Sequence, residues 1–131
     1  MRFTRFRNVV GAVGAVALIV GCAPLAPVRN VESQPVSASR PLTLDEVGNA
    51  IVRAGATLNL QMEKVEPGLI TATYAPRGTS ATMEVKYDTR QYSIAYKDSR
   101  GLNYDGRQIH RIYNNWVQNL DDRIRVQFST L

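Results

Sequence analysis

The chain has only one cysteine, Cys22, and one histidine, His110, among its 131 residues. A lone cysteine excludes a disulfide within the chain. One histidine is too few for the usual Cys/His zinc sites, and a Ser-His-Asp triad would have to use His110. His110 follows Ile109 at the margin of an apolar stripe, where we expect a surface or stripe-edge side chain. A phosphate-binding glycine loop is also missing from the sequence. We therefore predict no catalytic residue, no metal ligand and no cofactor.

The chain has little excess of basic charge outside its N-terminal segment. Removing Arg2, Arg5 and Arg7 lowers the formal net charge from +5 to +2. Acidic and basic residues alternate near the C-terminus, where Asp105, Asp121 and Asp122 are interleaved with Arg107, Arg111, Arg123 and Arg125. Carboxylates at adjacent positions of a helix do not face each other. We therefore expect Asp121 and Asp122 to be solvated. A nucleic-acid-binding protein would show a clustered basic face, and we predict none here.

The N-terminal segment has the layout of an export signal. Residues 1–8 carry three arginines and no acidic residue, and Val9–Val20 is an uncharged run of aliphatic and small residues. A basic head followed by a short apolar run is typical of a secretory signal peptide. The run is also too short for a membrane-spanning helix, which needs about 20 residues. We predict that residues 1–21 are a signal peptide that is removed.

The segment Ile19-Val20-Gly21-Cys22 resembles a bacterial lipobox, in which the cysteine receives lipid. The alternative is an ordinary signal peptide with a chance cysteine beside it. The resemblance implies a diacylglyceryl group on Cys22 and an acylated amine, and stable anchoring needs at least two chains. It also implies sorting to the outer membrane of a Gram-negative cell, because Ala23, and not Asp, follows the cysteine.

Residues 22–41 are predicted to form a lipidated flexible tether. The stretch is rich in proline and serine and poor in large apolar residues, so it cannot bury enough surface to offset chain entropy. A flexible chain of this length spans roughly 20–25 Å on average. We expect a spacer that lets the domain stand clear of the lipid headgroups.

The next residues, 42–55, carry the start signals of a helix. Thr43 and Glu46 have the spacing of a capping box, and Leu42 and Val47 that of a hydrophobic staple. Apolar residues recur at helical spacing after them. Gly55 is placed to serve as the C′ residue that ends the helix.

Alternation of apolar and polar residues then predicts strands over residues 57–65, 69–74, 81–87 and 92–97. The short connections favour an antiparallel meander, and the polar alternate positions favour a sheet covered on one face only. The first strand is open to a second interpretation, because residues 58–64 also fit a continued helix. We therefore predict three or four strands.

A second helix is predicted with Asp105 as its N-cap. Its apolar stripe comprises Ile109, Ile112, Tyr113, Trp116, Leu120 and Ile124. We expect this stripe to lie across the apolar face of the sheet, with Trp116 as the largest contributor to the core. Residues 125–131 fit either a helix or a strand. The predicted fold is a single α+β domain over residues 42–131, with an N-terminal helix, the meander, and a C-terminal helix on one sheet face.

The run from Ser93 to Trp116 resembles a pattern in small uncharacterised lipoproteins of Gram-negative bacteria. Its residues are Ser93 to Ser99, Leu102, Tyr104, Ile109, His110, Tyr113, Asn114 and Trp116. The similarity covers about residues 42–124. In that group an aromatic residue often follows the glycine that ends the first helix, whereas here Ala56 and Thr57 follow Gly55. The resemblance implies location and fold, and no chemistry.

Together these features predict a non-enzymatic outer-membrane lipoprotein. The domain would face the periplasm and bind an envelope protein or a cell-wall component such as peptidoglycan. The connection before the second helix is a possible partner-binding loop, formed by Ser99, Arg100, Leu102, Asn103 and Tyr104. Packing of Leu102 and Tyr104 under the sheet edge is the alternative for this loop. The alternative function is a small periplasmic ligand-binding protein or hydrolase whose site assembles only in three dimensions.

Overall fold

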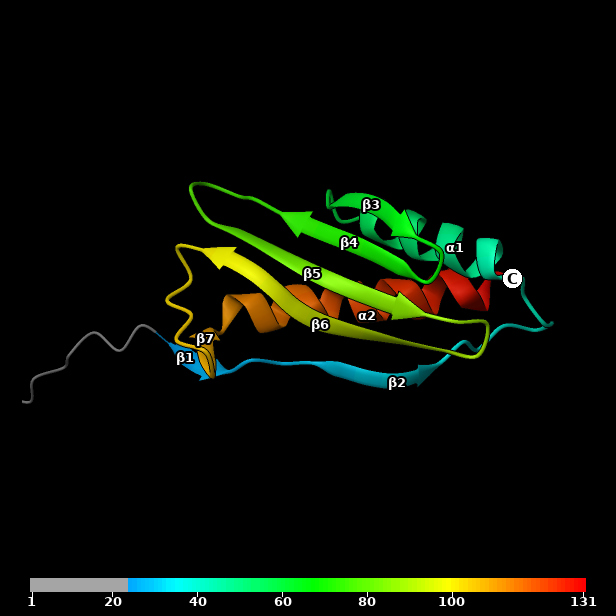
Figure 1. Cartoon of the computed structure of the whole chain (residues 1–131), viewed down its shortest axis with the longest axis horizontal. Helices are drawn as coiled ribbons and strands as arrows, with labels where there is room; N and C mark the ends of the chain where they lie inside the picture. The colour runs from blue at the N-terminus through cyan, green and yellow to red at the C-terminus, as the bar shows by residue number, and fades with distance from the viewer. Residues whose placement is uncertain (1–23) are drawn as a thin grey trace, which may run out of the picture.

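A computed structural model describes residues 24–131 as an α+β fold with two helices, a five-stranded antiparallel sheet and a two-stranded antiparallel sheet. The strand order of the larger sheet is β2-β6-β5-β4-β3, and β1 pairs with β7 in the smaller one. Both helices lie on the same face of the larger sheet (Figure 1). The predicted signal peptide and Cys22 lie outside the described residues.

Four consecutive strands form the predicted meander. They are β3 (Gln61–Glu66), β4 (Leu69–Tyr74), β5 (Ser80–Tyr87) and β6 (Gln91–Arg100). Each pairs antiparallel with the next. The first strand starts later than predicted, because residues 57–60 turn back on the preceding helix: the Leu60 amide donates to the Gly55 carbonyl at 3.0 Å, and Asn59 has φ +59°.

The predicted flexible tether is wrong from residue 25 onward. Residues Leu25–Pro27 form β1, and Val31–Pro35 form β2, which pairs with β6 at the sheet edge. Val31 is buried. Two of the four prolines in the predicted tether, Pro27 and Pro35, are the last residues of β1 and β2, and both are edge strands, where proline is tolerated. Backbone hydrogen bonds to β6 and the burial of Val31 offset the entropy that this segment loses when it becomes ordered. The amino-acid composition does not include these contributions.

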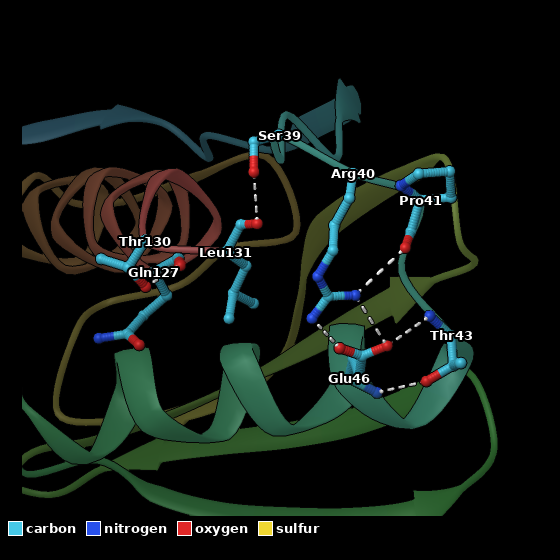
Figure 2. Close-up of polar contacts among 8 residues, drawn as sticks. All are labelled: Ser39, Arg40, Pro41, Thr43, Glu46, Gln127, Thr130 and Leu131. Carbon is cyan, nitrogen blue, oxygen red and sulfur yellow. Dashed lines mark hydrogen bonds and ion pairs between the residues drawn. The ribbon is translucent and has the colours of Figure 1, made fainter.

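The segment between β2 and the first helix is also fixed to the domain. The Val36 amide donates to the Arg90 carbonyl at 2.8 Å, and the Ser39 hydroxyl donates to the Leu131 carbonyl at 2.7 Å. Figure 2 shows this contact beside the start of the helix. The folded unit therefore does not begin at residue 42, because it includes residues 24–41 of the predicted tether.

Helix α1 (Leu44–Ala56) begins with the predicted capping box. The Glu46 amide donates to the Thr43 hydroxyl, and the Thr43 amide donates to the Glu46 carboxylate, each at 3.2 Å. Arg40 adds an ion pair to the same carboxylate (Figure 2). The Arg40 hydrogen bond, followed by that from the Thr43 backbone, lowers the pKa of Glu46 to about 2. This helix is confirmed.

The role predicted for Gly55 is wrong. The helix continues through Gly55 to Ala56, and Gly55 is buried within it. A Cβ at this position would lie 2.1 Å from the Met62 sulfur and 2.6 Å from its Cγ. A side chain at position 55 would have to displace Met62. Glycine therefore permits the close approach of α1 to β3 and does not form a left-handed helix end.

Helix α2 (Ile112–Ser129) starts later and ends later than predicted. Ile109 belongs to β7 (Gln108–His110). Asp105 caps the turn before β7 instead, because its Oδ1 accepts from the amides of Arg107 and Gln108. The ambiguous tail is helical to Ser129. Its buried face comprises Tyr113, Val117, Leu120, Asp121, Ile124 and Phe128.

The core lies between the helices and one face of the larger sheet. It is built from fully buried side chains of α1, the inner face of β4 to β6, and α2. Trp116 is not its main contributor, because it is only partly buried and meets Tyr74 edge-on at 4.9 Å. Its place is taken by Tyr92, Tyr113 and Phe128. The predicted apolar stripe began at Ile109, which belongs to β7 and not to α2. The buried face of α2 therefore differs from the predicted one.

Candidate functional site

The N-terminus of the described chain, β7 and the start of α2 come together at one end of the domain (Figure 1). We call this region, residues 24–29 and 101–114, the β1–β7 end. The Arg111 amide donates to the Pro24 carbonyl at 2.8 Å, and the Val28 amide donates to the Arg107 carbonyl at 3.0 Å. The first described residue is thus held at the first turn of α2.

Large apolar side chains are exposed at this end. Leu25 is 41% exposed, Tyr104 40% and Ile112 36%. Alternation explains Leu25: its neighbour Ala26 pairs with the buried Ile109, so Leu25 projects from the opposite face of the pair.

Basic residues are exposed at the same end of the domain. Arg29, Arg107 and Arg111 are exposed at the β1–β7 end. Asp105 is the acidic residue among them, and its Oδ1 is occupied by two backbone amides. Those amide hydrogen bonds lower the pKa of Asp105. The β1–β7 end therefore combines exposed apolar groups with a net positive charge.

The structure divides the predicted partner-binding loop. Ser99 and Arg100 are the last residues of β6. Leu102 is buried at 2% exposure. Asn103 has φ +54° and, with Tyr104, is exposed. Part of the alternative interpretation is therefore correct: Leu102 packs into the core and Tyr104 does not.

Tyr104 of this loop contacts a cluster of aromatic side chains in the domain. Tyr104 stacks on Tyr96 with ring centroids 4.0 Å apart, and Tyr96 meets Tyr113 edge-on at 5.6 Å. Within the described part of the chain, the Tyr113 hydroxyl is buried without a hydrogen-bond partner. Burial is the main cause that raises the pKa of Tyr113. Tyr96 therefore packs against one side of the Tyr104 ring, while the rest of the Tyr104 side chain stays exposed.

His110 lies on β7, at the junction with α2. Its Nδ1 accepts a hydrogen bond from the Ile112 amide at 3.1 Å, which satisfies one of the free donors at the helix start. No hydrogen bond between His110 and a carboxylate occurs within residues 24–131. The side chain is half-buried, as the sequence predicted for a stripe-edge histidine.

Asp121 corrects the expectation of a solvated carboxylate pair. Asp122 is exposed, whereas Asp121 is buried at 1% exposure. One Asp121 oxygen accepts from the Tyr92 hydroxyl at 2.5 Å, and the other pairs with Arg125. Both carboxylate oxygens are engaged, so this group links α2 to β6.

A shallow groove of about 320 Å³ lies at the other end of the sheet. It is formed by the β3–β4 and β5–β6 turns together with Ser33 of β2. Most of its lining is polar or backbone: Ser33, Glu66, Pro67, Gly68, Leu69, Lys86, Tyr87, Asp88, Gln91, Tyr92 and Ser93. No sequence pattern predicts this groove, because it needs β2 beside the β5–β6 hairpin turn.

Comparison with known proteins adds no relative. No protein-family model, curated protein or solved structure matches the chain. Among residues 24–131, no cluster of three or more His, Cys, Asp or Glu side chains is arranged to hold a metal ion. Over the same part of the chain, no helix has the length and apolar character needed to cross a membrane.

Proposed function

We propose that this protein is an outer-membrane lipoprotein, held by acyl chains on Cys22, with its α+β domain in the periplasm. The observation that carries the proposal is the segment Ile19-Val20-Gly21-Cys22, placed directly after a basic head and a short apolar run. Its resemblance to small lipoproteins of Gram-negative bacteria, and Ala23 after the cysteine, support the outer membrane as the location.

We further propose that the domain binds another envelope component without catalysis. His110 uses Nδ1 to cap α2, and Asp121 uses both oxygens to hold Tyr92 and Arg125. Each of these groups has a structural role that accounts for its position. This supports a binding protein over the hydrolase alternative.

The groove at the β3–β4 and β5–β6 turns is the surface we propose for the partner. Small-molecule sites are mostly apolar and have volumes of about 300–1,000 Å³. The groove has about 320 Å³, at the lower end of that range, and about half of its lining residues have polar or charged side chains, such as Lys86, Asp88 and Gln91. A polar surface of a protein or of the cell wall suits such a lining better than a small ligand.

Fractionation and mass measurement test the anchor. The mature protein purified from membranes should have the mass of residues 22–131 plus a diacylglyceryl group and an acyl chain. Cys22→Ser should block acylation and the cleavage that depends on it, so no protein with the mature acylated mass should be recovered from the membranes. Retention of the Cys22→Ser protein in membranes with unchanged processing would contradict the proposal.

Photocrosslinking tests the partner surface. A photoreactive residue in place of Gln91 should capture a specific envelope protein or glycan in intact cells. The same residue at Asn103, in the loop predicted from the sequence, is the matched control. Capture from Asn103 and not from Gln91 would return the partner site to the loop, and bulk contaminants alone from both positions would count against partner binding.

A further inference from the structure

The distance between the acyl-bearing residue and the folded domain is very short. Pro24 is already bonded to the start of α2 through its carbonyl, and β1 begins at Leu25. Cys22 and Pro24 are separated by Ala23 alone. Consecutive Cα atoms are about 3.8 Å apart, so the Cα atoms of Cys22 and Pro24 are at most about 8 Å apart whatever the backbone conformation.

That reach is comparable to the thickness of the lipid headgroup layer. The hydrocarbon core is about 30 Å thick and the whole bilayer about 40–45 Å, which leaves about 5–7 Å of headgroups on each side. If the acyl chains lie in the hydrocarbon core, Pro24 cannot be carried far beyond the headgroups. The flexible tether predicted over residues 22–41 would have removed this constraint, but β1 and β2 are part of the fold.

The surface placed there has the composition of a membrane interface. Leu25, Tyr104 and Ile112 are exposed, and tyrosine is enriched where membrane meets water. Arg107 and Arg111 are exposed at the same end of the domain. Basic side chains near an anionic membrane surface are attracted to it.

We propose that the β1–β7 end rests on the lipid headgroups, with Leu25, Tyr104 and Ile112 at the interface and Arg107 and Arg111 toward anionic lipid. The inference depends on lipidation of Cys22, as in the proposed function. It orients the domain: the end with the β3–β4 and β5–β6 turns, which forms the groove, points away from the membrane. Tyr104 is thereby assigned to lipid and not to a protein partner.

The test uses two positions on α2. Ile112 and Val126 are both exposed apolar residues, at 36% and 52%. They are separated by fourteen residues of one helix, which places them on nearly the same side of α2 but about 21 Å apart along its axis. Because the acylated Cys22 is the natural cysteine of the chain, a second cysteine introduced at either position is the sole free thiol for a fluorescent label.

The lipidated full protein carrying Ile112→Cys or Val126→Cys is labelled and reconstituted in vesicles of phosphatidylethanolamine and phosphatidylglycerol. A fraction of the lipid carries a nitroxide on its headgroup. We expect the label at position 112 to lose most of its fluorescence and the label at position 126 to keep most of it. Tyr104→Cys is a second probe at the same end and should behave like Ile112→Cys.

Each other outcome is decisive. Equal quenching at positions 112 and 126, whether strong or weak, overturns the proposed orientation while leaving the lipid anchor in place. A mass without acyl chains on Cys22 in the same sample overturns both the anchor and the orientation. Crosslinks from position 112 to protein instead of lipid in native membranes would show that a partner covers this end, and would overturn its assignment to lipid.

Discussion

The hydroxyl of Tyr92 on β6 donates a hydrogen bond to the Asp121 carboxylate on α2, with 2.5 Å between the two oxygens, and both side chains are buried. Arg125 supplies the balancing charge from the solvent side, with about half of its side chain exposed. A buried carboxylate is tolerated only when it is paired and hydrogen-bonded. This contact therefore fixes how α2 lies against the sheet.

Tyr92→Phe should lower the free energy of unfolding by about 1.5–3 kcal/mol, the usual worth of a hydrogen bond to a charged group. Urea unfolding of the mature chain carrying Cys22→Ser measures the change. Tyr104→Phe makes the same chemical change at an exposed side chain and should alter stability by less than about 0.5 kcal/mol. Equal losses in the two variants would contradict a structural role for the Tyr92–Asp121 pair.

Alkaline pH should destabilise the domain through the same tyrosine. Burial, followed by the hydrogen bond to Asp121, raises the pKa of Tyr92, and burial raises that of Tyr113. A group with a raised pKa contributes stability that is present below its unfolded pKa, about 10 for tyrosine, and lost as the pH rises above it. Unfolding monitored by tyrosinate absorbance should therefore begin above about pH 10. Tyr92→Phe should weaken the pH dependence, and an unchanged profile would exclude Tyr92 as a cause.

Acid should weaken the start of α1. The pKa of Glu46 is lowered from 4.5 to about 2, first by Arg40 and then by the Thr43 backbone. A lowered pKa contributes stability above the unfolded value and loses it as the pH falls from about 4.5 toward 2. Glu46→Gln should flatten the stability profile in this window, measured by urea unfolding at successive pH values. Asp45→Asn, an exposed neighbour, is the control, and an equal effect there would contradict a specific role for Glu46.

Gly55→Ala should destabilise the domain by about 1–3 kcal/mol, the usual cost of overpacking, because the new Cβ collides with Met62. Met62→Ala removes the colliding atoms, so the double variant should lose less than the two single losses added together. Thermal and urea unfolding measure all three variants. Strict additivity would show that the collision is not the cause.

Val31→Ala tests whether β2 belongs to the domain. Removing two methyl groups from this buried side chain should cost about 1.5 kcal/mol or more, at about 0.8 kcal/mol for each group. A flexible tether would show no effect. Glu32→Ala changes an exposed residue of the same strand and should leave the urea midpoint nearly unchanged, and equal midpoints for both variants would restore the tether.

Local signals predicted the elements that depend on local chemistry. The capping box of Thr43 and Glu46 located α1, and period-two alternation located most of β3 to β6. The start of α2 was misplaced because Ile109 continues the helical spacing, although pairing with Ala26 holds it in β7. The spacing of apolar residues cannot predict this pairing between residues far apart in the sequence.

The unpredicted parts all need residues distant in sequence. Burial of Asp121 depends on Tyr92, and the groove depends on Ser33 meeting the hairpin turn. The low apolar content of residues 24–41 favours disorder when composition alone is considered. Composition does not include the backbone hydrogen bonds that a neighbouring strand provides. The β6 edge provides the hydrogen bonds that make β2 a strand.

The closeness of β1 to the proposed lipid attachment also bears on the order of events during biogenesis. Proteolysis favours exposed, poorly ordered backbone, yet Pro24 and Leu25, just after the Gly21–Cys22 bond, are engaged by Arg111 and His110 in the folded domain. Acyl transfer and cleavage should therefore precede closure of the β1–β7 pair, or require it to open. Premature folding of the domain would slow maturation, and substitutions that weaken β1–β7 pairing should speed it.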